Sequence, residues 1–301
     1  MQLWQEYHTP TTVEEALQLL AAHNGEARII AGGTDLLIDI QFSIEHRPTV
    51  LVDVTSIPEM TQISKQDGLI YVGAAVTHTA IVKSGLIEAE ATCLVESCGV
   101  VGGPQVRNVG TLGGNVAHAL PAGDGTTSLV ALDAEAEVAW HDGRREWLPI
   151  GQLFKGPGQS ALDSSHDVLV GFRFRPTGQH EATAFKRIMR PQGVALPVLG
   201  CAVWVRLDGD TIAESRICIG PVSRVPVRAV EVEAVLRGSS IHDLAAATAA
   251  AHESLHPRTS KYRATAEYRS HMIDTLLERA LPLAIERART GRVQAEGVGL
   301  G

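Results

Sequence analysis

The stretch QVRNVGTLGGNVAHALPAGD, from Gln105 to Asp124, crowds Gly110, Gly113 and Gly114 into one short loop. Glycine lets the backbone turn with a positive φ and approach a ligand closely, and the free amides of a following helical turn can bind an anion. The carboxylate of Asp124, a few residues further on, could accept a hydrogen bond from a ligand hydroxyl. The stretch therefore predicts a loop that holds a phosphate, next to a carboxylate that holds a polar end of the same ligand.

A second glycine-rich loop lies upstream, in ARIIAGGTDLLIDI between Ala27 and Ile40. A β-like run ends directly in Gly32 and Gly33, and Thr34 could add a hydroxyl donor. One glycine pair alone is more often a tight turn without a ligand. Two amide-rich loops and a carboxylate, however, suit a dinucleotide, which carries a pyrophosphate and two polar ends. We therefore expect the two loops to converge on a single diphosphate.

Other chemical motifs are missing from the sequence. Neither loop has the spacing GxGxxG or GxxxxGK[ST], which argues against Rossmann and P-loop folds. No GxSxG elbow supports nucleophilic hydrolysis, and the 12 histidines show no HxH or HExxH spacing. We therefore expect no catalytic side chain and no metal site in this chain.

The part before residue 176 alternates helices and strands. Helical spacing covers 12–23, and a strand at 27–30 and another at 49–54 complete a small βαβ-like unit. A further strand begins at Leu69, and helix-like spacing runs over 81–98. The run 128–139 passes from helix to strand, and strands are expected at 146–149 and 168–174.

Beyond residue 176 the pattern changes. Apolar and polar residues alternate over 201–222 around a turn at Asp208 to Asp210, which predicts an antiparallel hairpin with one solvated face. Helical spacing returns at 229–236, at 244–254 and at 268–288. We place a domain boundary near residue 176.

Composition limits the function. Lys and Arg number 26 against 34 Asp and Glu in 301 residues, a net charge of −8, and no long basic run occurs, so nucleic acid is not an expected partner. No stretch approaches the roughly 20 apolar residues of a membrane span, and MQLWQEYHTPTT lacks the basic start and apolar run of a secretory leader, so a cytoplasmic location is expected. The four cysteines lie too far apart to hold a zinc ion or an iron-sulfur cluster. If redox metals participate, another chain carries them.

The two glycine-rich loops resemble those of one family, the FAD-binding medium subunits and domains of the xanthine dehydrogenase, carbon monoxide dehydrogenase and aldehyde oxidoreductase group of molybdenum hydroxylases. AGGTDLL at Ala31 to Leu37 looks like the first flavin loop of that family. QVRNVGTLGGN at Gln105 to Asn115, followed by PAGD at Pro121 to Asp124, looks like the second. Weaker similarity in LVDVTSIPEM, VGAAVTHTAI, TAFKRIMR and SKYRATAEYR extends the resemblance over nearly the whole chain.

The resemblance implies an α+β fold in two domains. Residues 1–176 would form a two-lobed FAD-binding domain of the vanillyl-alcohol-oxidase or PCMH-like type, with lobes at about 1–55 and 56–176. Residues 177–286 would form a C-terminal domain like that of the CO dehydrogenase flavoprotein, an antiparallel sheet with helices. Residues 287–301 would be a tail.

The resemblance also implies which residues hold FAD. The two loops would hold the pyrophosphate and ribityl groups, Asp124 would bind the adenosine or ribityl side, and two further positions would line the flavin. The expected FAD-binding residues are Ile30, Ala31, Gly32, Gly33, Thr34, Asp35, Leu36, Thr111, Leu112, Gly113, Gly114, Asn115, Asp124, Leu169 and Lys186. Contact of His118 with the flavin is left open. For Arg107 and Asn108, a role in tying the loop backbone together is favoured over phosphate contact.

The implied function is electron transfer in a complex. A large subunit would carry the molybdenum cofactor, a small subunit would carry 2Fe-2S clusters, and the FAD of this chain would deliver electrons to NAD, a quinone, a cytochrome or oxygen. The protein would bind and orient the flavin, whose redox chemistry is its own. The substrate pocket would lie in the molybdenum subunit. Two alternatives remain: a stand-alone flavin oxidase of the vanillyl-alcohol-oxidase-like group, or a flavin-free scaffold subunit.

Overall fold

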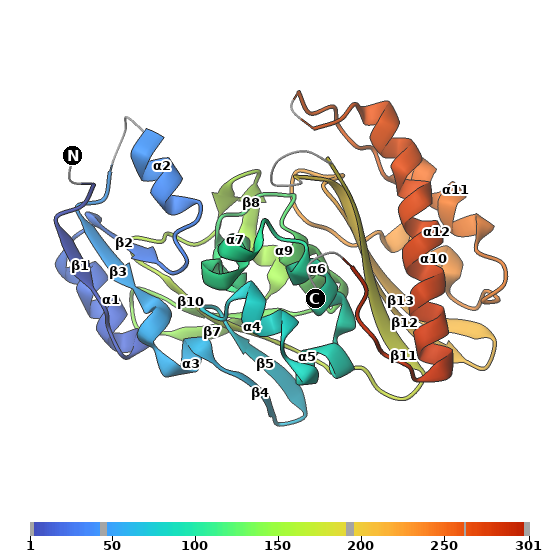
Figure 1. Ribbon diagram of the computed structural model, residues 1–301, viewed down its shortest axis with the longest axis horizontal. Coiled ribbons are helices and arrows are strands. Elements are labelled where there is room, and N and C mark those ends of the chain that lie inside the picture. The colour runs from blue at the N-terminus through green and yellow to red at the C-terminus, as the bar shows by residue number, and fades with distance from the viewer. Residues whose placement is uncertain (1–2, 43–46, 191–195, 262, 298–301) are drawn as a thin grey trace.

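A computed structural model describes residues 3–42, 47–190, 196–261 and 263–297. Three groups of elements follow one another along the long axis of the molecule (Figure 1). A small parallel sheet comes first, a larger antiparallel sheet covered by short helices lies in the middle, and a third sheet packed against helices comes last. No helix in the described ranges is long and apolar enough to cross a membrane.

The first sheet contains three parallel strands in the order β1-β3-β2. Its elements are β1 (Glu6–His8), α1 (Val13–Ala22), β2 (Ala27–Ile30), α2 (Leu36–Phe42) and β3 (Val50–Asp53). Thr12 begins α1 because its side chain accepts a hydrogen bond from the amide of Glu15, 3.1 Å away. The βαβ unit is confirmed, with β1 as an additional edge strand that periodicity did not predict.

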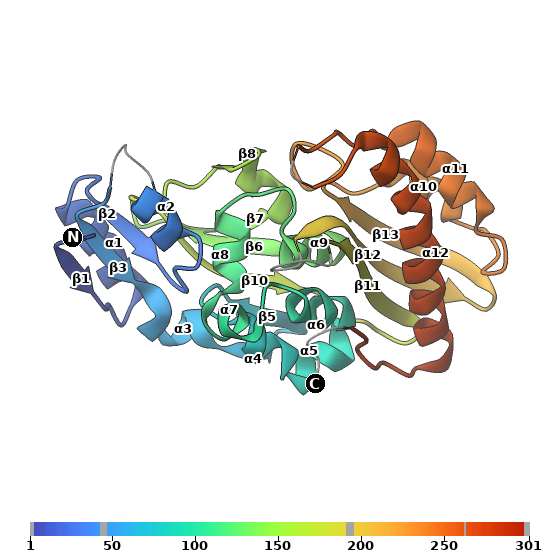
Figure 2. The same ribbon diagram turned by 45° about the horizontal axis from the view of Figure 1, so that its top comes forward.

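The middle sheet has five antiparallel strands in the order β4-β5-β10-β6-β7. Its strands are β4 (Ile63–Gln66), β5 (Leu69–Gly73), β6 (Glu135–Ala139), β7 (Arg145–Pro149) and β10 (Val168–Phe174), and β8 (Phe154–Gly156) and β9 (Gln159–Ser160) form a separate pair. The short helices are η1 (Val54–Ser56), α3 (Pro58–Thr61), α4 (His78–Val82), α5 (Gly85–Glu90), α6 (Thr92–Gly99), α7 (Pro104–Val109), α8 (Leu112–Ala117), α9 (Asp124–Ala131) and η2 (Ile150–Leu153). Several of these helices lie over the sheet on the side of the glycine loops (Figure 2).

The last sheet has three antiparallel strands in the order β11-β12-β13. Its elements are β11 (Glu181–Met189), β12 (Pro197–Asp208), β13 (Thr211–Gly220), α10 (Val230–Leu236), α11 (Ala245–Ser254) and α12 (Ala266–Thr290). The predicted hairpin is present as β12 and β13, whereas β11 was not predicted. The expectation that one face of the hairpin is solvated was wrong, because each face packs against a different hydrophobic core. The expected α+β fold, with an antiparallel sheet and helices in its C-terminal part, is confirmed.

The last sheet is buried on both faces. Phe185, Ala202 and Cys218 pack into the core shared with the middle sheet, whereas Ala184 and Cys201 pack into a second core beneath α12. Side chains alternate between the two faces because successive residues of a strand point in opposite directions. The sheet is therefore a partition between two cores, and all four cysteines are buried and free.

A buried carboxylate joins this sheet to α6. Glu96 Oε2 accepts from the amide of Phe185 at 2.6 Å, and Oε1 accepts from Arg287 Nη2 at 2.7 Å and from the amide of Glu296 at 2.9 Å. Arg287 also donates to the carbonyl oxygen of Thr183 at 2.9 Å. Glu96 and Arg287 are both almost fully buried, so one ion pair links α6, β11, α12 and residues near the C-terminus.

Candidate functional site

The two glycine loops meet backbone to backbone. A β-carbon placed on Gly32 would overlap the carbonyl oxygen of Val109 and the α-carbon of Gly110. Thr34 Oγ1 lies 3.7 Å from the position that a β-carbon on Gly110 would occupy. Glycine is required at residue 32 because any side chain there would separate the loops. The two loops therefore lie against each other, as expected, whereas their binding of one diphosphate stays a prediction.

The first loop leaves its backbone donors available. Strand β2 ends at Ile30, Gly33 turns the chain with a φ of 67°, and α2 begins at Leu36. The amides of residues 32–35 donate no hydrogen bond to another residue that the structure describes. Amides that converge at a turn before a helix suit an anion. The amides of residues 32–35 thus form a cradle that fits a diphosphate. The contact of Gly32 with Val109 leaves no room for a side chain at residue 32.

The second loop is anchored to the segment that follows β5. The amide of Leu112 donates to Val76 at 3.0 Å, and the amide of Gly113 donates to Ala74 at 2.8 Å. Thr111 begins α8, since its Oγ1 accepts from the amide of Gly114 at 3.0 Å. A β-carbon on Gly113 would overlap Ala74, so close packing explains this glycine. The amides of Leu112 and Gly113 already have backbone partners, so they are not free to bind a phosphate. The predicted contacts of these two residues with FAD stay predictions.

Asn115 connects the second loop to α9. Its Oδ1 accepts from both the amide and the hydroxyl of Thr126, each at 3.2 Å. Because α9 begins with Asp124, this contact fixes the predicted carboxylate relative to the loop.

Asp124 forms a buried ion pair with Arg187 of β11. Asp124 Oδ2 lies 2.6 Å from Arg187 Nη1, and both side chains are less than a tenth exposed. Burial raises the pKa of Asp124 to about 6, against the opposite effect of Arg187. Arg187 Nε is buried and has no hydrogen-bond partner among the described residues. Asp124 therefore lies next to a cation that sequence reasoning missed, and its own contact with FAD stays a prediction.

Lys186 and Leu169 occupy different surroundings. Lys186 precedes Arg187 on β11, so it points to the opposite face of the sheet, where its Nζ lies 2.8 Å from Glu296 Oε2. Leu169 is buried in β10, opposite Val138 of β6. Neither contact tests the predicted flavin lining. Successive residues of a strand point to opposite faces, so a strand assigned around Lys186 would have placed Arg187 on the face opposite to Lys186. This is the sequence signal that could have indicated Arg187.

Two histidines border the loops. His118 Nε2 lies 3.9 Å from Asp35 Oδ1, so it connects the helix after the second loop to the first loop. His78 is buried, its amide donates to the carbonyl oxygen of Gly110 at 3.0 Å, and its ring faces the same glycine. Burial, with a smaller effect of Arg107, lowers the pKa of His78 to about 4. His78 is therefore a neutral packing residue under the second loop.

Arg107 and Asn108 have structural partners. Arg107 Nη1 donates to the carbonyl oxygens of Gly102 at 2.9 Å and Val101 at 3.3 Å. Asn108 Oδ1 accepts from Thr79 Oγ1 at 2.7 Å. Arg107 thus ties the backbone before the loop together, as favoured, and Asn108 joins this segment to the side chain of Thr79 on α4. Phosphate contact of either residue stays untested.

Comparison with known families divides the chain into two matched regions. The family described as FAD binding domain in molybdopterin dehydrogenase matches residues 3–174. The family described as CO dehydrogenase flavoprotein C-terminal domain matches residues 183–284. The first region contains both glycine loops and Asp124, and the second contains Lys186 and Arg187.

Named relatives cover almost the whole chain. The xanthine dehydrogenase FAD-binding subunit of Escherichia coli O157:H7 is 31% identical over 94% of this chain and 96% of its own length. The carbon monoxide dehydrogenase medium chain of Hydrogenophaga pseudoflava is 30% identical over 94% and 97%. A solved structure of carbon monoxide dehydrogenase from Hydrogenophaga pseudoflava, 29% identical, superposes with a TM-score of 0.87 over 94% of this chain and 98% of that one. With the loop geometry, these matches show that the chain belongs to the family of FAD-binding domains of molybdopterin dehydrogenases, and that it is an oxidoreductase subunit whose cofactor is FAD.

Proposed function

We propose that this chain is the electron-transfer subunit of a molybdenum hydroxylase complex, and that it passes electrons from iron-sulfur clusters of a partner subunit to an external acceptor. The proposal rests on the contact between Gly32 and Val109 and on the amides of residues 32–35, which donate to no other residue in the described part of the chain. Together they make a backbone cradle of the kind that a flavin dinucleotide needs. The bound flavin supplies the redox chemistry, accepting electrons and releasing them again.

The residues of this chain bind and orient the cofactor. The first loop would hold the diphosphate through its amides, and Thr111 would keep the second loop in place through its cap. Asp124, fixed by Arg187, would hold a polar group of FAD. The set proposed to surround FAD is Ile30, Ala31, Gly32, Gly33, Thr34, Asp35, Leu36, Thr111, Leu112, Gly113, Gly114, Asn115, Asp124, Leu169 and Lys186. The division into domains near residue 176, with lobes at about 1–55 and 56–176, belongs to the same proposal.

The metal centres would be supplied by partners. The four cysteines are buried and their thiols are unavailable as ligands. We therefore assign the molybdenum cofactor to a large subunit and the iron-sulfur clusters to a small one, in a cytoplasmic complex. The acceptor would be NAD, a quinone, a cytochrome or oxygen.

Purification of the chain with its partners tests this function. The expected result is a complex with flavin absorbance, molybdenum and iron, in which a reduced iron-sulfur subunit reduces the flavin. A chain that binds FAD but oxidises a substrate without partners would favour a stand-alone flavin oxidase. A folded chain that binds its partners but no FAD would show a scaffold and overturn the proposal.

A further inference from the structure

The edge strand β1 carries a carboxylate and an imidazole on one face. Glu6 and His8 are two residues apart, so their side chains project from the same side of the strand, and His8 Nε2 lies 3.0 Å from Glu6 Oε2. Tyr7 projects to the other side, where its hydroxyl donates to Asp53 Oδ2 at 2.6 Å. This hydrogen bond and the pairing of β1 with β3 hold the strand in one register. The backbone positions of Glu6 and His8 are therefore fixed.

A second imidazole comes from the turn after α1. His23 is the residue that follows the helix, and its carbonyl oxygen accepts from the amide of Glu26 at 2.9 Å. Asn24 and Gly25 have φ values of 45° and 90°, so the chain reverses here before it enters β2. The turn places the ring of His23 beside β1, with its centroid 5.7 Å from that of the His8 ring.

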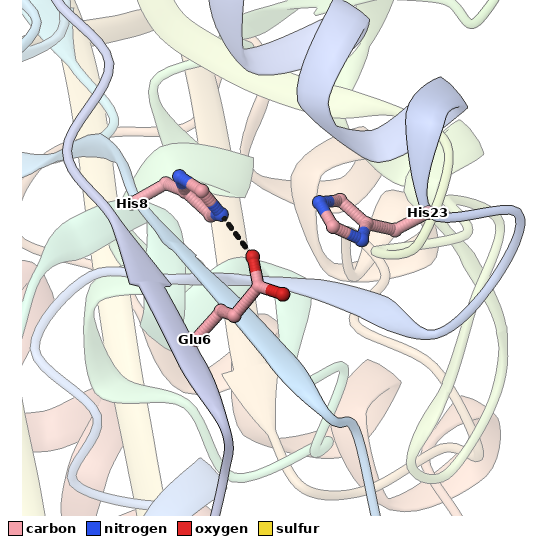
Figure 3. A group of neighbouring side chains, drawn as sticks. All are labelled: Glu6, His8 and His23. Atoms are coloured by element: carbon pink, nitrogen blue, oxygen red, sulfur yellow. Dashed lines mark hydrogen bonds and ion pairs between the residues drawn. The ribbon is translucent and has the colours of Figure 1, made fainter.

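The three side chains point toward a common space (Figure 3). One ligand atom from each of Glu6, His8 and His23 lies within 4.8 Å of the others, and no other three His, Cys, Asp or Glu side chains in the described part of the chain meet this condition. Ligand atoms in a tetrahedral zinc site are roughly 3.4 Å apart, since each lies about 2.1 Å from the metal. His8 and His23 are half-buried and Glu6 is exposed, so small side-chain rotations would close the group around one ion.

An ion pair between Glu6 and His8 explains only part of this group. Such exposed pairs are common on protein surfaces and need no metal. The ring of His23 is different, because its nitrogens have no hydrogen-bond partner among the residues that the structure describes, although it lies next to the pair. A bound ion would give all three side chains a common partner.

The end of α1 favours a cation at the same place. The helix has 10 residues and ends at His23, so the negative end of its dipole lies beside the three side chains. Its last turn contains no basic side chain that would use this field. Metal ligands and helix dipole therefore act in the same direction.

We propose that Glu6, His8 and His23 bind one zinc ion, which joins the edge strand β1 to the turn after α1. Two imidazoles and one carboxylate are a ligand set that zinc uses, with a water molecule in the fourth position. Mg²⁺ and Ca²⁺ prefer oxygen ligands, so the two imidazoles select against them. The sequence predicted no metal site because HxH and HExxH spacings are missing. Such spacings do not detect a ligand that comes from another element.

This site is separate from the diphosphate cradle. His23 precedes β2, whereas the first glycine loop follows β2. Strand β1 lies at the end of the molecule opposite to the last sheet (Figure 1). An ion that binds only the folded chain stabilises it by mass action. Zinc should therefore stabilise the first sheet without changing the environment of the flavin.

Titration of the chelator-treated, FAD-loaded protein with Zn²⁺ and Co²⁺ tests this site. One equivalent is expected to bind, Co²⁺ should give the visible spectrum of a tetrahedral complex, and Zn²⁺ should raise the temperature of thermal unfolding. His8→Asn, His23→Asn and Glu6→Gln should each weaken binding at least about tenfold and reduce the rise in unfolding temperature. Flavin absorbance should stay unchanged. Glu6 is exposed, so Glu6→Gln keeps the test valid even if a histidine variant fails to fold.

The matched control is His252→Asn, which should bind zinc as the wild type does. His252 and Asp274 form another exposed pair 2.9 Å apart, and no third ligand among the described residues lies close enough to complete a site. The four cysteines are buried, so their thiols do not compete for the metal. Absence of binding to the wild type would overturn the proposal. Binding that His23→Asn leaves unchanged would also overturn it, because the group would then be only an ion pair.

Discussion

The carboxylate of Asp124 and the guanidinium of Arg187 lie 2.6 Å apart across the junction between α9 and β11. Removing one partner would leave the other charge buried and unpaired, which costs about 3–5 kcal/mol in such pairs. We expect Asp124→Asn and Arg187→Met each to lower the free energy of unfolding by that amount, measured by urea denaturation. The double variant should lose less than the sum of the two single variants. Additive losses would show that the two groups do not interact.

Gly32 is expected to be sensitive to a single methyl group. In Gly32→Ala the new β-carbon would overlap the carbonyl oxygen of Val109, so the loops must move apart. We expect a loss of about 1–3 kcal/mol of stability and weaker FAD binding, measured by thermal unfolding and by fluorescence titration with FAD. Gly151→Ala is the control, because nothing lies within 4 Å of a β-carbon at that exposed position. Equal effects of the two substitutions would contradict the close approach of the loops.

Thr111 is expected to act through its hydroxyl. Thr111→Val removes the oxygen that accepts from the amide of Gly114, and loss of such a cap costs about 1 kcal/mol. Thr111→Ser keeps the oxygen and should retain most of the stability. Thermal unfolding of the two variants in the presence of FAD checks this, and a serine variant as unstable as the valine variant would assign the effect to packing.

His78 is expected to make the fold sensitive to acid. Its pKa is about 4 in the folded protein and 6.5 in the unfolded chain, so the unfolded chain binds more protons between these values. Its contribution is therefore present above pH 6.5 and is lost as the pH falls toward 4, on the order of 3 kcal/mol in total. Urea denaturation at pH 7 and pH 4.5 should show a smaller difference in His78→Gln than in the wild type. The exposed His242→Gln should behave like the wild type.

Local patterns indicated much of the fold. The helix expected at 12–23 spans Val13–Ala22, and the strand expected at 168–174 is present with the same ends. The helical run at 81–98 is instead interrupted, because Ser84 caps a new helix through the amide of Ile87. Strand β11 was missed because Lys186 and Arg187 interrupt its apolar pattern. A strand that faces two cores carries different residues on each face, and periodicity alone does not show this.

Partners distant in sequence limited the prediction of the site. The glycine loops could be recognised because each is local, and their contact followed from the expectation of one shared ligand. Arg187 lies 63 residues from Asp124, and nothing in the sequence joins them. The contact of Gly113 with Ala74 could not be predicted from the sequence either. Close packing and phosphate binding both favour glycine, so the residue type does not distinguish between them.

The Glu96 carboxylate has a consequence for protein engineering. It receives hydrogen bonds from β11, from α12 and from the amide of Glu296, so the acceptor stands in one half of the chain and its donors stand in the other. A chimera that joins the first 176 residues of this protein to the second half of a relative would keep the acid but depend on foreign donors. Such a chimera should therefore fold where the second half carries an arginine at the position of Arg287, and it should misassemble where that arginine is missing.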